Sequence, residues 1–404
     1  MFRKDLRKKF LILLISSILI QIFIPCMTKA FANEETKEKN LIESAEEMKI
    51  ETDNKLNSLY DYINKMKTDE ELLNELDPKS YVESYIKNGQ GNLTIKELGL
   101  MAVNLLFKEV RVVLKLVISV VAIAILCSLL KNLEDAFKNE SISNIAFYAC
   151  YSVLIIILSR SFLISIDVAT NVINSISEFM NALLPVLVGM IALAGGFVQA
   201  ATMDPIVLGS VILIPKIYSN FIIPMILVSF VLKFANNLST EHKIDNLCKL
   251  ISQGILWFQG IIITIFIAML TIRGITADTM DAVALKTTKF AVDNFVPIVG
   301  KAFSDAITSI AGYSLIIKNA ITGIGLIVIV LIILYPIIKL VLMTFIYKIS
   351  ASLVEPISDK RITSALSMIG ESMVLLTSCV ISVSFMFFIL LGIMASAGKF
   401  VVGG

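Results

Sequence analysis

Few residues of this 404-residue chain are of types, and at spacings, that would support catalysis. The single histidine, His242, lies between Glu241 and Lys243 in a polar stretch, where a solvated loop residue is the simplest interpretation. One histidine cannot build a zinc site or a conventional serine–histidine pair. The HExxH, P-loop and GxSxG motifs are also missing from the sequence. We therefore expect no enzymatic activity, no metal site and no cofactor.

The more distinctive residues are lysines close to prolines within apolar runs. Lys216 follows Pro215, and Lys339 follows Pro336 by three positions. Proline frees backbone polar groups, which a membrane tolerates only inside protein or beside a water-filled cavity. An ionisable residue at membrane depth marks a route or an ion pair. We expect Lys216 and Lys339 to line a route through the membrane or to pair with other groups.

Three other ionisable residues adjoin apolar runs. Arg160 and Arg273 each end such a run, where a membrane anchor whose guanidinium reaches the interface is the simplest interpretation. Glu371 starts the last run and comes closest to the membrane carboxylate that a proton-coupled carrier would need. This pattern favours a channel or a scaffold over a secondary carrier.

The elements that must position these residues are membrane helices. Hydrophobic residues make up 56% of the chain, and its apolar runs reach the roughly 20 residues that cross a bilayer core of about 30 Å. The net charge is +2, and no basic cluster with interleaved aromatic residues indicates nucleic-acid binding. We predict an all-α, polytopic membrane protein with about seven transmembrane helices, some of them broken by Pro or Gly. The expected spans lie near 112–131, 144–165, 182–202, 205–233, 250–272, 317–350 and 370–396.

The N-terminus has the parts of a cleavable signal peptide, predicted over residues 1–32. A basic segment precedes an apolar run, and Ala30 and Ala32 form the small-x-small cleavage site. The charged region 33–93 would then lie outside the cytoplasm.

Region 33–93 carries apolar residues at helical spacing, including Leu59 and Ile63, so it should form short amphipathic helices. It is either a solvated stalk or a docking surface for a partner. Thr94 and Glu97 then form a capping box, which predicts that a helix over 94–131 begins near residue 95 and runs into the first span.

Two stretches of the membrane region, 144–249 and 250–355, resemble each other, and 356–404 adds a final span and a short tail. Three membrane segments in each copy would invert the second copy, and inverted repeats with broken helices are typical of transporters and channels. A gene duplication without a pore would leave the same pattern. Gly323 and Gly325 would permit close helix approach or bending. The candidate pore or hinge residues are Pro185, Gly189, Gly195, Gly196, Pro215, Lys216, Pro297, Gly300, Pro336 and Lys339.

The order of these features resembles the stage III sporulation protein AE family of endospore-forming bacteria. The features are the signal that ends in Ala30-Phe31-Ala32, the charged region after it, and the segments 183–196, 290–300 and 336–359. The resemblance covers essentially the whole chain, most specifically about 144–365. Because these segments are apolar, it rests on their order and spacing.

The resemblance implies a multi-pass protein of the mother-cell membrane that surrounds the forespore, with its N-terminal region in the intermembrane space. Besides membrane lipids, the implied partners are a secretion-type ATPase, ring-forming proteins and a forespore membrane partner, within a complex that joins the two cells. The implied role is a channel or permease-like subunit that supports forespore development and late forespore gene expression. The alternatives are a scaffold that anchors the complex without conducting, and a stand-alone small-solute permease.

Overall fold

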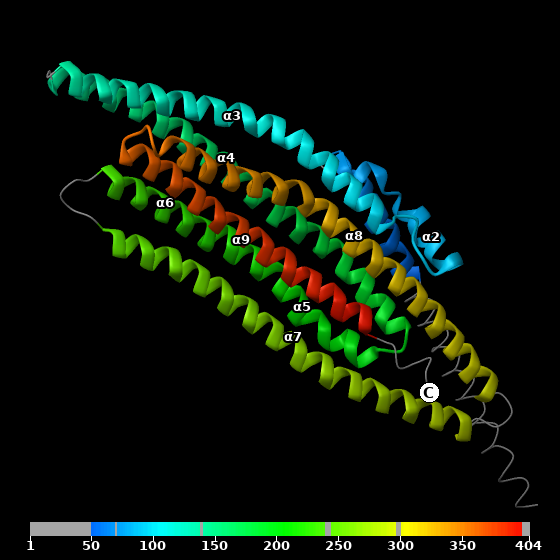
Figure 1. The fold of residues 1–404 in the computed structure, drawn as a ribbon. Coiled ribbons are helices and arrows are strands. Elements are labelled where there is room, and N and C mark those ends of the chain that lie inside the picture. The colour runs from blue at the N-terminus through cyan, green and yellow to red at the C-terminus, as the bar shows by residue number, and fades with distance from the viewer. Residues whose placement is uncertain (1–49, 69–70, 138–139, 239–243, 296–299, 398–404) are drawn as a thin grey trace, which may run out of the picture. The chain divides into compact units, whose positions relative to one another are not determined.

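The structure is a computed structural model that describes residues 50–68, 71–137, 140–238, 244–295 and 300–397 (Figure 1). The chain divides into two compact units, Met1–Asn54 and Lys55–Gly404. Only residues 50–54 of the first unit are described, and the helices below belong to the second. The regular elements of the described part are all helices, which confirms the predicted all-α class. The predicted cleavage site at Ala30 and Ala32 lies outside the described residues, as does His242.

Six described helical segments are long and apolar enough to cross a membrane, where about seven were expected. The difference arises because 182–202 is no separate span. Its first part continues the preceding helix through Pro185, and the chain turns only at Gly195, whose φ of 91° suits glycine. The elements are α3 (Ile95–Phe137), α4 (Glu140–Leu193), α5 (Phe197–Ile217), the π-helix η2 (Tyr218–Ile222), α6 (Ile223–Leu238), α7 (Asp245–Phe295), α8 (Gly300–Val354) and α9 (Lys360–Ser396).

Shorter helices precede α3. Residues 55–66 are helical, and η1 (Glu71–Glu75) and α2 (Pro78–Asn88) follow. Half of the predicted capping box is present, because the backbone N–H of Thr94 donates to Oε2 of Glu97 at 2.8 Å, and α3 begins at the next residue as predicted. The backbone N–H of Glu97 donates to the backbone carbonyl of Thr94 rather than to its hydroxyl. The predicted apolar spacing is also confirmed, because Leu59 and Ile63 are fully buried in the core.

The three longest helices far exceed the thickness of a bilayer core. The helices α4, α7 and α8 contain 54, 51 and 55 residues, which at 1.5 Å per residue gives each a length of about 75–80 Å. A hydrocarbon core of roughly 30 Å covers less than half of that length. Each of these helices therefore combines a membrane-length part with a long extension.

The internal repeat has a different form from the one expected. Each copy contains two long helical segments, α4 with α5–η2–α6 in the first and α7 with α8 in the second (Figure 1). Among the described residues each copy thus has two segments long enough to cross a membrane, where three were considered. Whether the second copy is inverted stays a prediction. Helix α4 continues through Arg160, and the role of this residue as a membrane anchor stays a prediction.

The C-terminal helix α9 lies at the centre of the helix packing. In the most apolar 18-residue stretch of α9, 67% is buried, whereas in that of α7 only 22% is buried. Around it, close helix approach depends on two glycines, as predicted. A Cβ on Gly325 would meet Cδ2 of Leu183 in α4 at 2.7 Å, and one on Gly323 would meet the hydroxyl of Tyr81 in α2 at 3.1 Å.

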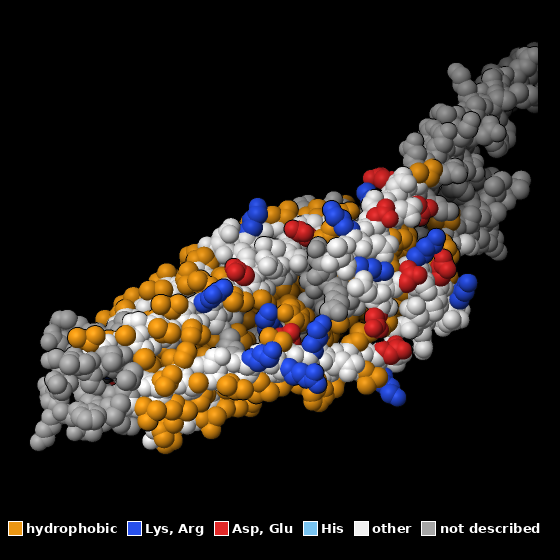
Figure 2. All heavy atoms as spheres, turned by 90° about the horizontal axis from the view of Figure 1, so that it is seen from above, with side chains coloured by type: hydrophobic (Ala, Val, Ile, Leu, Met, Phe, Trp, Pro, Cys, Tyr) orange, Lys and Arg blue, Asp and Glu red, His pale blue; other side chains and the backbone are white. Residues whose placement is uncertain are grey.

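The outward face of α4 changes character along its length. Up to Ile164 its exposed residues include large apolar side chains, such as Val153 and Ile156. Figure 2 shows the same trend on the face seen from above, where hydrophobic side chains gather at one end and charged ones become common toward the other. After Ile164, a polar outward face typical of a helix in water begins. The exposed residues of this second half of α4 are Asp167, Asn171, Asn174, Glu178 and Asn181.

The helical segment 55–66 lies beside this second half, while η1 and α2 pack on α8. The hydroxyl of Tyr62 donates to Oε2 of Glu178 at 3.4 Å, and Leu59 and Ile63 belong to the same core as Phe179. We call the end of the helix bundle that carries them the α2 end. The opposite end, where α4 begins and α6 ends, is the Tyr148 end.

Candidate functional site

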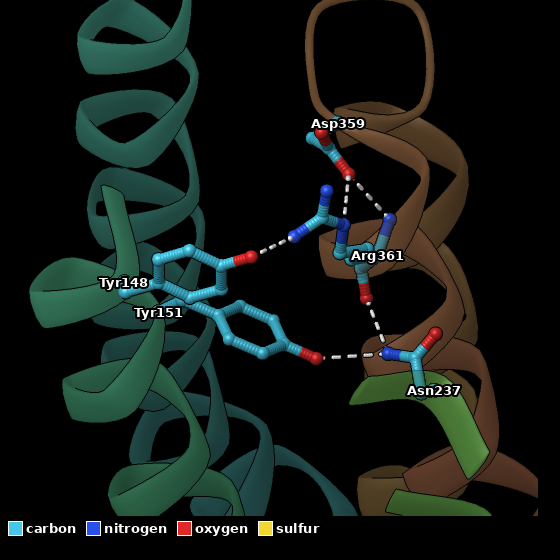
Figure 3. A network of polar contacts seen from close by, with 5 residues as sticks. All are labelled: Tyr148, Tyr151, Asn237, Asp359 and Arg361. Carbon is cyan, nitrogen blue, oxygen red and sulfur yellow. Dashed lines mark hydrogen bonds and ion pairs between the residues drawn. The ribbon is translucent and has the colours of Figure 1, made fainter. Parts of the chain in front are cut away.

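A network of polar contacts joins three helices at the Tyr148 end (Figure 3). Asp359 caps α9, because its carboxylate accepts from the backbone N–H of Arg361 at 2.8 Å. The guanidinium of Arg361 donates to the hydroxyl of Tyr148 in α4 at 3.0 Å. The side-chain amide of Asn237 in α6 donates to the hydroxyl of Tyr151 and to the backbone carbonyl of Arg361, both at 2.8 Å. These contacts fix the register of α4, α6 and α9.

An ion pair links α6 to α9 further along. Nζ of Lys233 lies 2.9 Å from Oε2 of Glu371. The side chain of Lys233 is 9% exposed, whereas that of Glu371 is 56% exposed. The lysine stem therefore contributes apolar packing while its ammonium reaches a carboxylate at the protein surface. Removing Glu371 alone would leave a buried cation without its partner.

A buried polar cluster lies between α7 and α9. Oε1 of Gln259, whose side chain is nearly fully buried, accepts from the hydroxyls of Ser378 at 3.1 Å and Ser382 at 3.2 Å. Its amide nitrogen lies 3.3 Å from Sγ of Cys379, a weak acceptor. Tyr218, the first residue of the π-helix, is fully buried, and its hydroxyl interacts with Ser382.

A buried lysine binds the C-terminal end of α9. Lys318 of α8 is fully buried, and its ammonium donates to the carbonyl of Ala395 at 2.9 Å and to that of Ala397. These carbonyls belong to the last turn and cap of α9, where backbone acceptors have no helical partner and a cation is favourable. Lys318 thus holds the C-terminal end of α9 against α8.

These contacts lie at intervals along α9 and join it to α4, α6, α7 and α8 in turn. We call them the α9 seam, from Arg361 through Glu371, Ser378 and Ser382 to Ala395. At 1.5 Å per residue the seam is about 50 Å long. Its groups are suited to hold α9 between its neighbours or to offer a polar path. Among the described residues, no group of three His, Cys, Asp or Glu is placed to hold a metal ion.

The break at Pro215 is compensated by a neighbouring helix. Proline has no backbone N–H, so the carbonyl of Val211, four residues earlier, loses its helical donor. The hydroxyl of Ser177 in α4 donates to that carbonyl at 3.1 Å. Three residues after Pro215 the helix widens into η2, where the backbone N–H of Ile223 bonds to the carbonyl of Tyr218. Protein groups therefore satisfy this freed backbone.

Comparison with known proteins identifies the family. The model of the family described as "Stage III sporulation protein AE" matches residues 76–398. The chain belongs to this family. A relative from Bacillus subtilis (strain 168), named "Stage III sporulation protein AE", is 30% identical over 294 residues, which cover 73% of this chain and 74% of the relative. No solved structure matches the chain.

In this member of the stage III sporulation protein AE family, the predicted pore residues of the first copy are spread along α4 and α5. Pro185 and Gly189 are half-buried inside α4. Gly195 makes the turn at the α2 end, and Gly196 caps α5. Lys216 is exposed beside the buried Pro215.

The described pore candidates of the second copy of the repeat lie along α8. Pro336 is buried within a continuous α8, and the ammonium of Lys339 donates to the hydroxyl of Tyr335 in the turn before it, at 2.9 Å. Gly300 is the first residue of α8, whereas Pro297 lies outside the described residues. The expected role of Lys339, lining a route or pairing with other groups, stays a prediction.

Of the two predicted membrane anchors, Arg160 and Arg273, the structure describes the side chain of Arg160. Arg160 has an exposed side chain in mid-helix, on the outer face of α4. Arg273 lies within α7, and its side chain is outside the described part.

Apart from Glu371, the residues that form the α9 seam were not predicted from the sequence. Lys233 immediately follows the apolar run 217–232, and Gln259 lies in the middle of the charge-free run 251–272. A buried amide or lysine is costly unless it is bonded. A polar or charged residue in or beside an apolar run is therefore a sequence signal for a buried contact. This signal would have identified Lys233, Gln259 and Lys318.

Proposed function

We propose that this protein is the membrane-embedded scaffold of the complex that joins mother cell and forespore. The observation that carries the proposal is the change of surface along α4. Its first half has apolar side chains that suit lipid, and its second half has a polar outward face and lies beside the helical segment 55–66. Such a helix both anchors a protein in a membrane and extends it into the adjacent aqueous space.

The orientation follows from the predicted signal peptide. Cleavage after residue 32 would place the α2 end outside the mother-cell cytoplasm, in the intermembrane space. The polar stripe of α4, Asp167 to Asn181, would then face that space. There it is available to the ring-forming proteins or to the forespore partner, and the Tyr148 end would face the cytoplasmic ATPase.

The interior supports a scaffold more than a pore lined by the Pro-Gly segments. Large side chains that are fully buried fill the space between α4, α8 and α9, including Phe162, Phe179, Tyr347 and Phe387. Tyr347 also bonds across this interior, because its hydroxyl donates to Oγ of Ser161 at 2.5 Å. Late forespore gene expression would then depend on the complex that the scaffold holds together.

Charge on the polar stripe tests this proposal. We expect the double substitution Asn171→Arg and Asn174→Arg to leave the protein in the membrane but to prevent co-purification of the complex and to block sporulation. The matched control, Asn171→Ser with Asn174→Ser, keeps a small polar surface and should sporulate normally. Normal sporulation and normal co-purification of the arginine variant would refute the docking role of this stripe.

A second candidate, conduction along the α9 seam, is favoured by the ion pair of Lys233 and Glu371 and by the Gln259 cluster. The double substitution Lys233→Met and Glu371→Gln removes both charges without leaving one of them buried and unpaired. A scaffold predicts that this variant still supports late forespore gene expression. An assembled complex without that expression would favour conduction.

A further inference from the structure

Four basic side chains lie at one height along the helix bundle, each on a different helix. They are Lys115 of α3, Arg160 of α4, Lys249 of α7 and Lys348 of α8. Each is exposed, and none of them has an acidic partner among the described residues. We call these four side chains the basic belt.

A contact between α8 and α4 sets the height of two members of the belt. The hydroxyl of Tyr347 donates to Oγ of Ser161 at 2.5 Å. Lys348 adjoins Tyr347 in the chain, and Arg160 adjoins Ser161. Because one residue advances a helix by only about 1.5 Å, the two cations lie at nearly the same height.

Lys115 lies at this height on α3. The thiol of Cys127 in α3 interacts with that of Cys150 in α4, and the two helices run in opposite directions (Figure 1). Lys115 is 12 residues before Cys127, and Arg160 is 10 residues after Cys150. These separations are about 18 Å and about 15 Å toward the same end of the bundle. Lys115 and Arg160 therefore differ in height by about 3 Å.

Lys249 reaches the same height through α6. The ring of Phe230 in α6 stacks on that of Phe162 in α4, with centroids 4.0 Å apart. The hydroxyls of Ser229 in α6 and Ser252 in α7 lie 3.1 Å apart. Lys249 is three residues before Ser252, which places it about 4.5 Å closer to the Tyr148 end. That is the height of the other members of the belt.

The acidic groups near Lys249 and α6 already have partners. Glu371, which is 56% exposed, pairs with Lys233. Asp245 lies one turn from Lys249, and its carboxylate accepts from the amide of Asn236 at 2.6 Å. The exposed belt therefore keeps its positive charge and attracts anions.

Each cation of the belt has a large exposed apolar side chain close to it on its own helix. These neighbours are Leu114 beside Lys115, Ile156 one turn before Arg160, Leu250 beside Lys249 and Phe345 one turn before Lys348. A cation among exposed apolar groups suits a membrane surface, where the apolar groups contact acyl chains and the charge reaches the phosphates. An anionic partner without acyl chains would leave these apolar side chains in water.

The distribution of the belt also favours lipid over one docked protein. Its members come from four helices, and α3 and α7 lie on opposite sides of the bundle (Figure 1). A membrane surrounds a protein on all sides, whereas one docked protein covers one face. Arg160 also lies four residues before Ile164, after which the outward face of α4 becomes polar.

We propose that the basic belt binds the phosphate groups of anionic phospholipids at one surface of the membrane. The belt fixes the height of the protein in the bilayer. This inference rests on the proposed placement of the apolar half of α4 in lipid, but not on the scaffold role. A lipid that meets one cation of the belt gains about fivefold in affinity from its charge.

Spin-labelled lipids test the belt in the full-length protein, reconstituted in phosphatidylcholine vesicles. The fraction of label immobilised at the protein surface is compared for phosphatidylglycerol and phosphatidylcholine. We expect about fivefold tighter association of phosphatidylglycerol, which falls toward equality at 1 M salt because salt screens exposed charges. Equal association of the two lipids at low salt would overturn the proposal, and this comparison needs no variant.

Matched sets of substitutions then locate the effect. The belt variant, with Lys115, Arg160, Lys249 and Lys348 each changed to Gln, should bind both lipids equally. The control changes four exposed lysines at the α2 end to Gln and should keep the preference; these are Lys65, Lys79, Lys87 and Lys96. A preference that survives in the belt variant, or that is lost in the control, would refute the belt. Because the readout is lipid association of the isolated protein, either result leaves the test of the scaffold role separate.

Discussion

The two halves of α4 bury similar cores but expose opposite surfaces. Between Ile145 and Ile164 the outer face carries large apolar side chains, and Arg160 is the one charged residue of that stretch. From Asp167 onward the exposed residues are Asp, Asn or Glu. Both halves belong to one continuous helix. If the first half faces lipid and the second half faces water, as we propose, the length of this helix does not define a membrane span.

If the second half of α4 is an aqueous domain with its own core, a core truncation there should have the cost seen in soluble proteins. Phe179 is fully buried in that half. We expect Phe179→Ala to lower the free energy of unfolding by about 3–5 kcal/mol, through lost transfer energy and the remaining cavity. Denaturant titration in detergent measures this loss. A cost below about 1 kcal/mol would mean that this half does not form a packed core.

The same charge placed on each half should have unequal effects. Val153→Lys puts an ammonium on the apolar face, at an expected insertion cost of about 2.5–3.5 kcal/mol near the membrane centre. Asn174→Lys changes one exposed polar residue for another, so its cost should stay within about 0.5 kcal/mol. The amount of each variant in the membrane fraction measures the difference. Equal amounts of the two variants in the membrane fraction would contradict the proposed difference between the two halves of α4.

The contact between Ser177 and Val211 ties the polar half of α4 to the break in α5. Ser177→Ala should destabilise the protein by about 1–3 kcal/mol, because it removes the donor to the carbonyl that Pro215 leaves unpaired. Pro215→Ala restores a backbone N–H at that place. In a double-mutant cycle we therefore expect the cost of Ser177→Ala to fall in the Pro215→Ala background. Additive costs would show that the two residues do not share this carbonyl.

A small pH effect is expected at the α2 end. Burial raises the pKa of Tyr60 to about 12, and the charge of Glu83 adds to this shift. Because the folded state prefers the neutral phenol, its contribution to stability is complete below pH 10 and is lost as the pH rises from about 10 to 12. Tyr60→Phe should weaken this alkaline destabilisation, as measured by Tm against pH. An unchanged pH profile would assign the effect to other groups.

Local patterns in the sequence predicted the helical membrane class, the start of α3 after Thr94 and the buried positions Leu59 and Ile63. They failed where the outcome depended on distant parts of the chain. The expected spans 144–165 and 182–202 were treated as separate, yet the first and most of the helical part of the second belong to the one continuous helix α4, which packs against α8 and α9.

The contacts of the α9 seam were beyond prediction for the same reason. Lys233 and Glu371 are 138 positions apart. The local sequence around either residue does not indicate that the other is its partner. Ser177 is one of several small polar residues in the second half of α4, and only the packed structure places its hydroxyl on the carbonyl freed by Pro215. Single side chains that repair or join helices thus depend on tertiary contacts that one sequence does not contain.

Cysteine accessibility along α4 tests the central claim most directly. Val153→Cys and Asn174→Cys would be compared in intact membranes with a membrane-impermeant maleimide, after replacement of Cys150, the one described cysteine that is not fully buried. We predict that Asn174→Cys is labelled and that Val153→Cys is protected. Protection of both would place the whole of α4 in lipid or in a sealed interface, and would contradict the division of this helix between membrane and water.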